Sequence, residues 1–218
     1  MQSQVDLYTG PHKGQRLRFF TISKAAGTLN VNDENALNMF EGELASFRDN
    51  MYLHANIEEK FIHPLLSERV PGGADKLNED HRIMHRQFDE LVACFGETKK
   101  KPREELSLEF YLAWNRFTSF YLNHIDYEEE YVMPALWKLC TSDELGEVFK
   151  KALAGQTPKE LMENLGMMLP AMSQSERAML LNQGRATMPP EAFLATLKLA
   201  ERVLAPEDWA SLKATLKL

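Results

Sequence analysis

The stretch HANIEEKFIHPLL, residues 54–66, decides how this chain is interpreted. Its His54 and Glu58 continue an apolar stripe whose spacing of three and four residues is that of one buried helix face. Phe61 and Leu65 then resume the stripe. A histidine and a glutamate therefore occupy positions where a core-facing helix needs hydrophobic side chains. The apolar residues that precede them are Leu37, Phe40, Leu44, Phe47 and Met51.

The same helical spacing recurs along the chain, and alternating β-branched runs are absent from the sequence. We therefore predict an all-α protein, an antiparallel up-and-down four-helix bundle followed by several shorter helices. Start and stop signals place the long helices at about 9–26, 33–68, 74–98 and 102–139. Because helix length and punctuation change near residue 140, we expect two parts, a bundle at 1–140 and a helical extension at 141–218.

The extension shows its own helix starts. Capping-box patterns occur at 141–144, 157–160 and 173–176, and prolines at 189–190 and 206 mark two further breaks. It contains no histidine. We interpret it as a packing layer or a docking surface for a protein partner.

Composition and charge exclude several classes of protein. With 218 residues, 44% hydrophobic and 26% charged, the chain is of ordinary globular type. Its formal net charge of −7 argues against nucleic-acid binding. No run approaches the roughly 20 apolar residues of a membrane span, so we expect an unprocessed soluble protein with no membrane partner. The two cysteines, Cys94 and Cys140, form no CxxC motif, and a reducing bacterial cytoplasm is the expected location.

Other predicted helices carry the same interruption. The last long helix repeats the pair with His124 and Glu128, the third has two histidines, His81 and His85, and the first has His12. Each pair is spaced i, i+4, so both side chains lie on one helix face, one turn apart. For a single histidine the ordinary explanation is a hydrogen-bonded core residue.

Seven coincident interruptions change that interpretation. In an up-and-down bundle all seven positions fall at the same end. Buried carboxylates and imidazoles are costly unless they are paired or bound to a metal. Five imidazoles and two carboxylates suit iron, manganese or zinc and exceed the needs of one tetrahedral ion. Two octahedral ions sharing both carboxylates and a hydroxide would fill about eleven of twelve positions, which leaves one for a small ligand.

With these residues the chain resembles the hemerythrin-like proteins, the HHE cation-binding family, over about residues 8–139. The pattern is a histidine followed by HxxxE, HxxxH and HxxxE on four helices, and the neighbouring text GPHKGQR, IEEKFIHPLL and NHIDYEEEYVMPAL also matches. The resemblance implies an oxo- or hydroxo-bridged di-iron centre. On this basis one iron would be held by His81, His85 and His124, the other by His12 and His54, with Glu58 and Glu128 bridging.

One departure concerns the last carboxylate, which in oxygen-carrying hemerythrins is an aspartate five residues after its histidine. Here Glu128 is four residues after His124 and Glu129 is five. Helical phase favours Glu128, with Glu129 as the alternative.

Residues beside the motif receive other roles. His63 is nine residues after His54, a rotation of about 180°, so we predict that it points away from the seam and is not a ligand. We expect Glu59, Glu129 and Glu130 to face solvent or to support the ligands from behind, and Tyr127, Tyr131 and Trp114 to pack around the site.

The leading functional hypothesis is a non-haem di-iron protein that binds or senses O₂, NO or peroxide and is not an enzyme. A di-iron enzyme for peroxide or oxygen reduction, or for the repair of iron centres, uses the same ligands and is the first alternative. A structural or interaction bundle without functional metal is the second.

Overall fold

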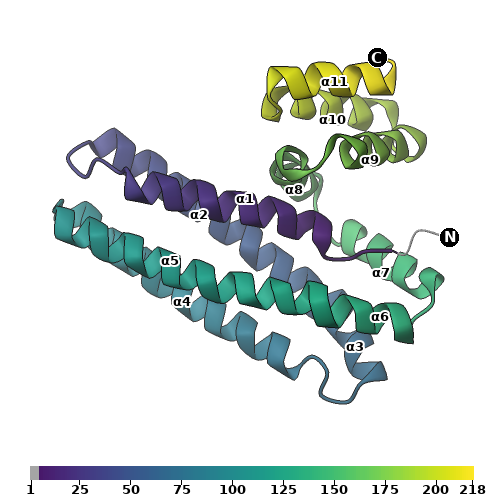
Figure 1. The fold of residues 1–218 in the computed structure, drawn as a ribbon, viewed down its shortest axis with the longest axis horizontal. Helices are drawn as coiled ribbons and strands as arrows, with labels where there is room; N and C mark the ends of the chain where they lie inside the picture. Colours follow the sequence, from purple (N-terminus) through teal and green to yellow (C-terminus); the bar gives the residue numbers. More distant parts are fainter. Residues whose placement is uncertain (1–4) are drawn as a thin grey trace. The chain divides into compact units, whose positions relative to one another are not determined.

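The computed structural model describes residues 5–218, which are helical without any strand. This confirms the all-α prediction. Consecutive long helices run in opposite directions (Figure 1). The elements that form the bundle are α1 (Thr9–Gly27), α2 (Glu34–Ile57), η1 (Glu58–Ile62), α3 (His63–Arg69), α4 (Asp75–Lys100), α5 (Glu104–Tyr127), η2 (Glu128–Val132) and α6 (Met133–Leu139).

Two of the four predicted long helices are each divided by one turn of π-helix. The helix predicted at 33–68 consists of α2, η1 and α3, and the helix predicted at 102–139 consists of α5, η2 and α6. In η1 the backbone N–H of His63 donates to the carbonyl of Glu58, five residues earlier. In η2 the N–H of Met133 donates to Glu128 in the same way. Each π-turn therefore begins at one of the predicted metal-binding glutamates.

A π-turn uses one residue more than an α-turn, so each one moves the buried face forward by one position. After Glu58 the buried apolar residues of η1 and α3 are Ile62 and Leu66. The predicted continuation through Phe61 and Leu65 is therefore wrong, because both of these side chains are only partly buried.

The second helix shows the same shift. Val132 and Leu136 are buried, whereas Tyr131, which the uninterrupted pattern places in the core, is 62% exposed. The error has one cause, since the prediction assumed a constant α-helical period through both glutamates.

The bundle core is aromatic. Phe19, Phe47 and Trp114 pack together with ring centroids 4.6 to 5.6 Å apart, and none of the three is measurably exposed. Tilted and edge-on ring pairs of this kind stabilise a core beyond the burial of their area. A second cluster of buried apolar residues surrounds the π-turns and includes Tyr8, Ile62, Val132 and Leu136. The predicted site lies between these two clusters along the helices.

Helix ends agree with the expected local signals. The side chain of Asp33 accepts hydrogen bonds from the backbone N–H groups of Asn35 and Ala36 and caps α2. Gly72 has a φ of 74° in the turn before α4, a conformation that glycine adopts without strain. These signals fix where the long helices begin, and therefore at which level of the bundle the polar residues lie.

The remaining helices are α7 (Ser142–Ala154), α8 (Pro158–Ala171), α9 (Gln174–Thr187), α10 (Pro190–Val203) and α11 (Pro206–Leu216). Contacts divide the chain into one unit with Arg18–Gly155 and the residues up to Thr9, and another with Gly10–Leu17 and Gln156–Leu218. Helix α7 packs against η1 and belongs to the first unit. A folding boundary at residue 140 stays a prediction.

The last four helices start at a constant interval. Their N-caps, Thr157, Ser173, Pro189 and Ala205, are 16 residues apart. The predicted capping boxes at 141–144, 157–160 and 173–176 are all present. Within this unit α8 packs with α10 and α9 with α11. No helix of residues 5–218 has the length and apolar character needed to cross a lipid bilayer.

Candidate metal centre

The predicted site residues come from the four long helices of the bundle. Two of these helices contribute a histidine and a glutamate each, at equivalent positions. His54 is in the last turn of α2 and Glu58 begins η1, while His124 is in the last turn of α5 and Glu128 begins η2. His81 lies near the start of α4 and His12 near the start of α1. Apart from His54, which is partly buried, each of these six residues is buried.

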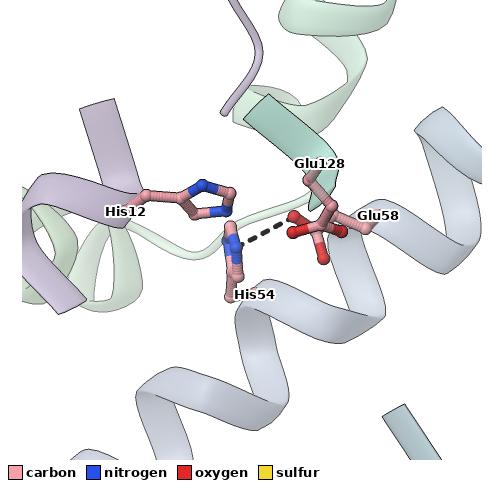
Figure 2. Close-up of side chains that lie close together, drawn as sticks. All are labelled: His12, His54, Glu58 and Glu128. Atoms are coloured by element: carbon pink, nitrogen blue, oxygen red, sulfur yellow. Dashed lines mark ion pairs between the residues drawn. The ribbon is translucent and has the colours of Figure 1, made fainter. Parts of the chain in front are cut away.

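Among residues 5–218, two overlapping sets of side chains each bring their ligand atoms within 4.8 Å of one another. Figure 2 shows one of them, in which the rings of His12 and His54 face the carboxylates of Glu58 and Glu128. The other set combines the same two carboxylates with His81 and His124. Both glutamates therefore belong to both sets, as bridging carboxylates would.

The distances between donor atoms test whether a metal ion fits. Two donors in adjacent positions, each about 2.1 Å from one ion, lie about 3.0 Å apart in octahedral and about 3.4 Å apart in tetrahedral geometry. The Nε2 atoms of His81 and His124 are 3.2 Å apart. His81 Nε2 is 3.3 Å from Glu58 Oε2, and His124 Nε2 is 3.3 Å from Glu128 Oε1. His54 Nε2 is 2.9 Å from Glu58 Oε1. These four distances, 2.9 to 3.3 Å, are close to those between two donor atoms on one ion, so the residues present fit a metal site.

Carboxylates also lie behind two of the imidazoles. Glu59 Oε1 is 2.9 Å from Nδ1 of His81, and Asp80 Oδ2 is 3.3 Å from Nδ1 of His124. Lys76 in turn pairs with Asp80. A carboxylate at Nδ1 holds the proton there and leaves the Nε2 lone pair for a metal. Glu59, expected to face solvent or to support a ligand from behind, is 41% exposed and contacts the His81 ring, and its support of a metal ligand stays a prediction. Asp80 is a further carboxylate beside an imidazole that the sequence interpretation missed.

The electrostatics show what compensates the buried carboxylates without a metal. Burial lowers the pKa of His124, but the charge of Glu128 and the hydrogen bond to Asp80 outweigh it and raise this pKa to about 10. The pKa of His81 is likewise raised, because the hydrogen bond and charge of Glu58 outweigh burial. Protons on these imidazoles thus neutralise the site, and a cation is the natural replacement for them.

His85 is the one predicted ligand outside both sets. Its ring packs against Tyr52 with centroids 4.1 Å apart, and its buried Nε2 atom has no hydrogen-bond partner among residues 5–218. Burial lowers the pKa of His85, and the charge of His81 lowers it further. The imidazole of His85, one turn from His81, is therefore neutral and keeps a nitrogen lone pair that can bind a metal ion.

The prediction that His63 points away from the seam is wrong. This side chain is 2% exposed, and its ring stacks on that of His81 with centroids 5.2 Å apart. The π-turn between Glu58 and His63 changes the helical phase that the prediction assumed. His63 is nevertheless in neither set of ligands.

A sequence signal for both π-turns exists in retrospect. HANIEEKFIHP and HIDYEEEYVMP share histidine, two glutamates four and five residues later, and a proline six residues after the first glutamate. Pro64 and Pro134 have no N–H to continue the α-helical ladder. Repetition of the whole pattern, and not of HxxxE alone, indicates the same backbone irregularity twice.

The residues expected to surround the site divide into different groups. Trp114 is buried in the aromatic core, whereas Tyr131 stacks on Tyr127 at the surface, with centroids 5.3 Å apart. Sequence reasoning missed Tyr8, which is fully buried in the apolar cluster beside the π-turns. Burial raises the pKa of Tyr8, and the charges of Glu128 and Glu58 raise it further, so its phenol stays neutral beside the carboxylates.

Convergent buried imidazoles and carboxylates at one end of a helical bundle define a protein able to hold metal ions. The family model described as the hemerythrin HHE cation binding domain matches residues 3–136. The chain belongs to this family, which confirms the resemblance drawn from its sequence.

Curated relatives match this chain at low identity. F-box/LRR-repeat protein 5 of Xenopus laevis is 27% identical over 157 residues, which cover 69% of this chain and 22% of the relative. The protein of the same name from Salmo salar is 23% identical over 175 residues, covering 78% and 24%. That from Bos taurus is 25% identical over 157 residues, covering 69% and 22%. The chain thus corresponds to less than a quarter of the length of these relatives.

Proposed function

We propose that the bundle holds two iron ions and uses them to bind or sense a small ligand, namely O₂, NO or peroxide. The observation that carries the proposal is that Glu58 and Glu128 each belong to both sets of convergent donors. When bound, a pair of bridged iron ions supplies exchangeable coordination positions and reversible electron transfer. Manganese and zinc suit the same nitrogen and oxygen donors and are the alternative metals.

The proposed ligands are assigned residue by residue. His12 and His54 would hold one ion, and His81 and His124 the other, with Glu58 and Glu128 shared. His85 is proposed as a further ligand of the second ion, although its ring packs on Tyr52. Glu128 is preferred to Glu129 because its carboxylate is fully buried within both sets.

The protein supplies three further functions in this proposal. Glu59 and Asp80 orient His81 and His124 through their Nδ1 atoms. The aromatic core on one side and the apolar cluster around Tyr8 on the other exclude water from the centre. Low local polarity strengthens the hold of the charged donors on the ions and discourages their exchange.

A protein partner is part of the proposal. The relatives are named for an F-box and leucine-rich repeats, and the matched region is a small share of their length. A domain found within a longer protein favours a role in which its metal or ligand state is read by another protein surface. The helices after residue 155 are the proposed docking part of this chain.

The test is a metal count on anaerobically purified full chain, paired with absorption spectra before and after exposure to air, NO or peroxide. We expect about two iron ions per chain and new visible charge-transfer bands on exposure. His54→Ala and Glu58→Ala should lower the count, whereas Glu130→Ala, at an exposed position, should not. Full metal content without any spectral response would contradict ligand binding. Sustained consumption of peroxide with a reductant would favour the enzyme instead.

A further inference from the structure

The sixth histidine, His63, lies beside the centre without belonging to either ligand set. The π-turn η1 places it one wide turn after Glu58, and its ring stacks on His81 at an interplanar angle of 28°. Its side chain is almost completely buried. The matching position after η2 is occupied by Met133, so the two helices differ at this point.

One nitrogen of His63 has a clear partner. Its Nδ1 atom is 2.7 Å from Oδ1 of Asn78. An amide oxygen only accepts hydrogen bonds, so Nδ1 carries the proton in this arrangement and Nε2 carries the lone pair. The Asn78 contact therefore selects the tautomer whose free acceptor is Nε2.

That acceptor is buried, and within residues 5–218 no side chain or backbone group donates to it. Buried polar atoms without a partner are uncommon in folded proteins and indicate a missing water, ion or ligand. The His63 ring lies beside the centre, because its centroid is 5.2 Å from that of the His81 ring. Its missing partner is therefore best sought among groups bound at the centre.

We propose that His63 Nε2 accepts a hydrogen bond from a small exogenous ligand that carries a proton, and so favours such ligands over those that carry none. The inference rests on the proposed metal centre and adds a selectivity to it. His63 acts here as a hydrogen-bond acceptor beside the ions and not as one of their ligands. Met133, whose thioether is a weak acceptor, cannot perform this function at the matching position.

The experiment compares two probes on the iron-loaded full chain, hydrosulfide, which carries a proton, and azide, which carries none. Dissociation constants are measured by absorption titration at one fixed pH, together with the iron content of each variant. For His63→Met we expect the hydrosulfide constant to rise about tenfold, the size of one hydrogen bond, and the azide constant to change by less than about twofold. His63→Gln retains an acceptor oxygen and should recover part of the difference.

Met133→Leu is the matched control, and it should leave the ratio of the two constants unchanged. Equal changes for both probes in His63→Met, or no change for either, would overturn the proposal. A loss of iron in His63→Met and His63→Gln would also overturn it, because His63 would then support the ions themselves. If the unaltered chain binds no iron, the proposed function fails first, and the metal count separates that outcome from the others.

Discussion

The helices α2–η1–α3 and α5–η2–α6 present similar residues to the candidate metal centre and differ in the residue that ends each π-turn. Each has a histidine, then a glutamate that begins a π-turn, then a proline six residues later. One π-turn ends at His63 with a buried polar ring, and the other ends at Met133 with a buried apolar chain. The comparison separates the residues proposed to hold the ions from the residues that surround them.

The π-turn that both helices contain indicates why an unfavourable backbone conformation is retained. π-turns are rare and are found mostly at functional sites. Here each one leaves its glutamate in line with the histidine one turn earlier, while it turns the next positions, His63 and Met133, into the interior. A regular α-helix would bury Tyr131 in place of Val132 and would direct His63 elsewhere.

The prediction with the largest expected effect, on the free energy of unfolding, tests whether both helices share this register shift. Ile62→Ala and Leu136→Ala should each lower the free energy of unfolding of the metal-free protein by about 2–5 kcal/mol, because both remove a fully buried side chain. Tyr131→Ala should cost about 1 kcal/mol or less, since this side chain is largely exposed. Denaturant unfolding with a chelator present measures all three. A larger loss for Tyr131→Ala than for Leu136→Ala would restore the uninterrupted helix.

The next effect concerns the carboxylates behind the imidazoles, Asp80 behind His124 of α5 and Glu59 behind His81. Asp80→Asn keeps an acceptor oxygen but removes the charge, and we expect the metal affinity to fall about 10- to 100-fold. Glu59→Gln should have a smaller effect, because its side chain is 41% exposed whereas that of Asp80 is 13% exposed. Competition with a chelator measures the affinities.

Glu130→Gln is the control for these two variants, because it removes a nearby charge at an exposed position. All three variants with the same affinity as the unaltered chain would show that the outer carboxylates do not support the centre.

The smallest effect is a pH dependence of the metal-free protein. The pKa of His124 is raised to about 10, so its charged form contributes stability that is complete below about pH 6.5 and is lost as the pH rises through about 10. We expect the Tm to fall by at least about 4 °C over this interval. The fall in Tm should be smaller in His124→Gln. It should also be smaller in the metal-loaded chain, where Nε2 of His124 would bind the metal in place of a proton. A Tm that rises over this interval would contradict the assignment.

Sequence patterns predicted the helices and most of the side chains that converge at the candidate centre, since helix caps, loop glycines and the 3-4 spacing are local signals that tertiary contacts seldom override. Six of the seven predicted ligand positions converge in the two sets because the up-and-down topology brings matching ends together. His85 shows the limit of that reasoning. Residing on the correct helix face does not determine which rotamer packs against Tyr52.

The sequence by itself determined a helical bundle with histidines and glutamates at one end, because the spacing of residues along a helix settles which side chains share a face. Only the tertiary structure decided the two π-turns, the burial of His63 and the pairing of Asp80 with His124. These features depend on contacts between helices. An inserted residue in a turn is tolerated only where neighbouring helices bury the side chains that it reorients.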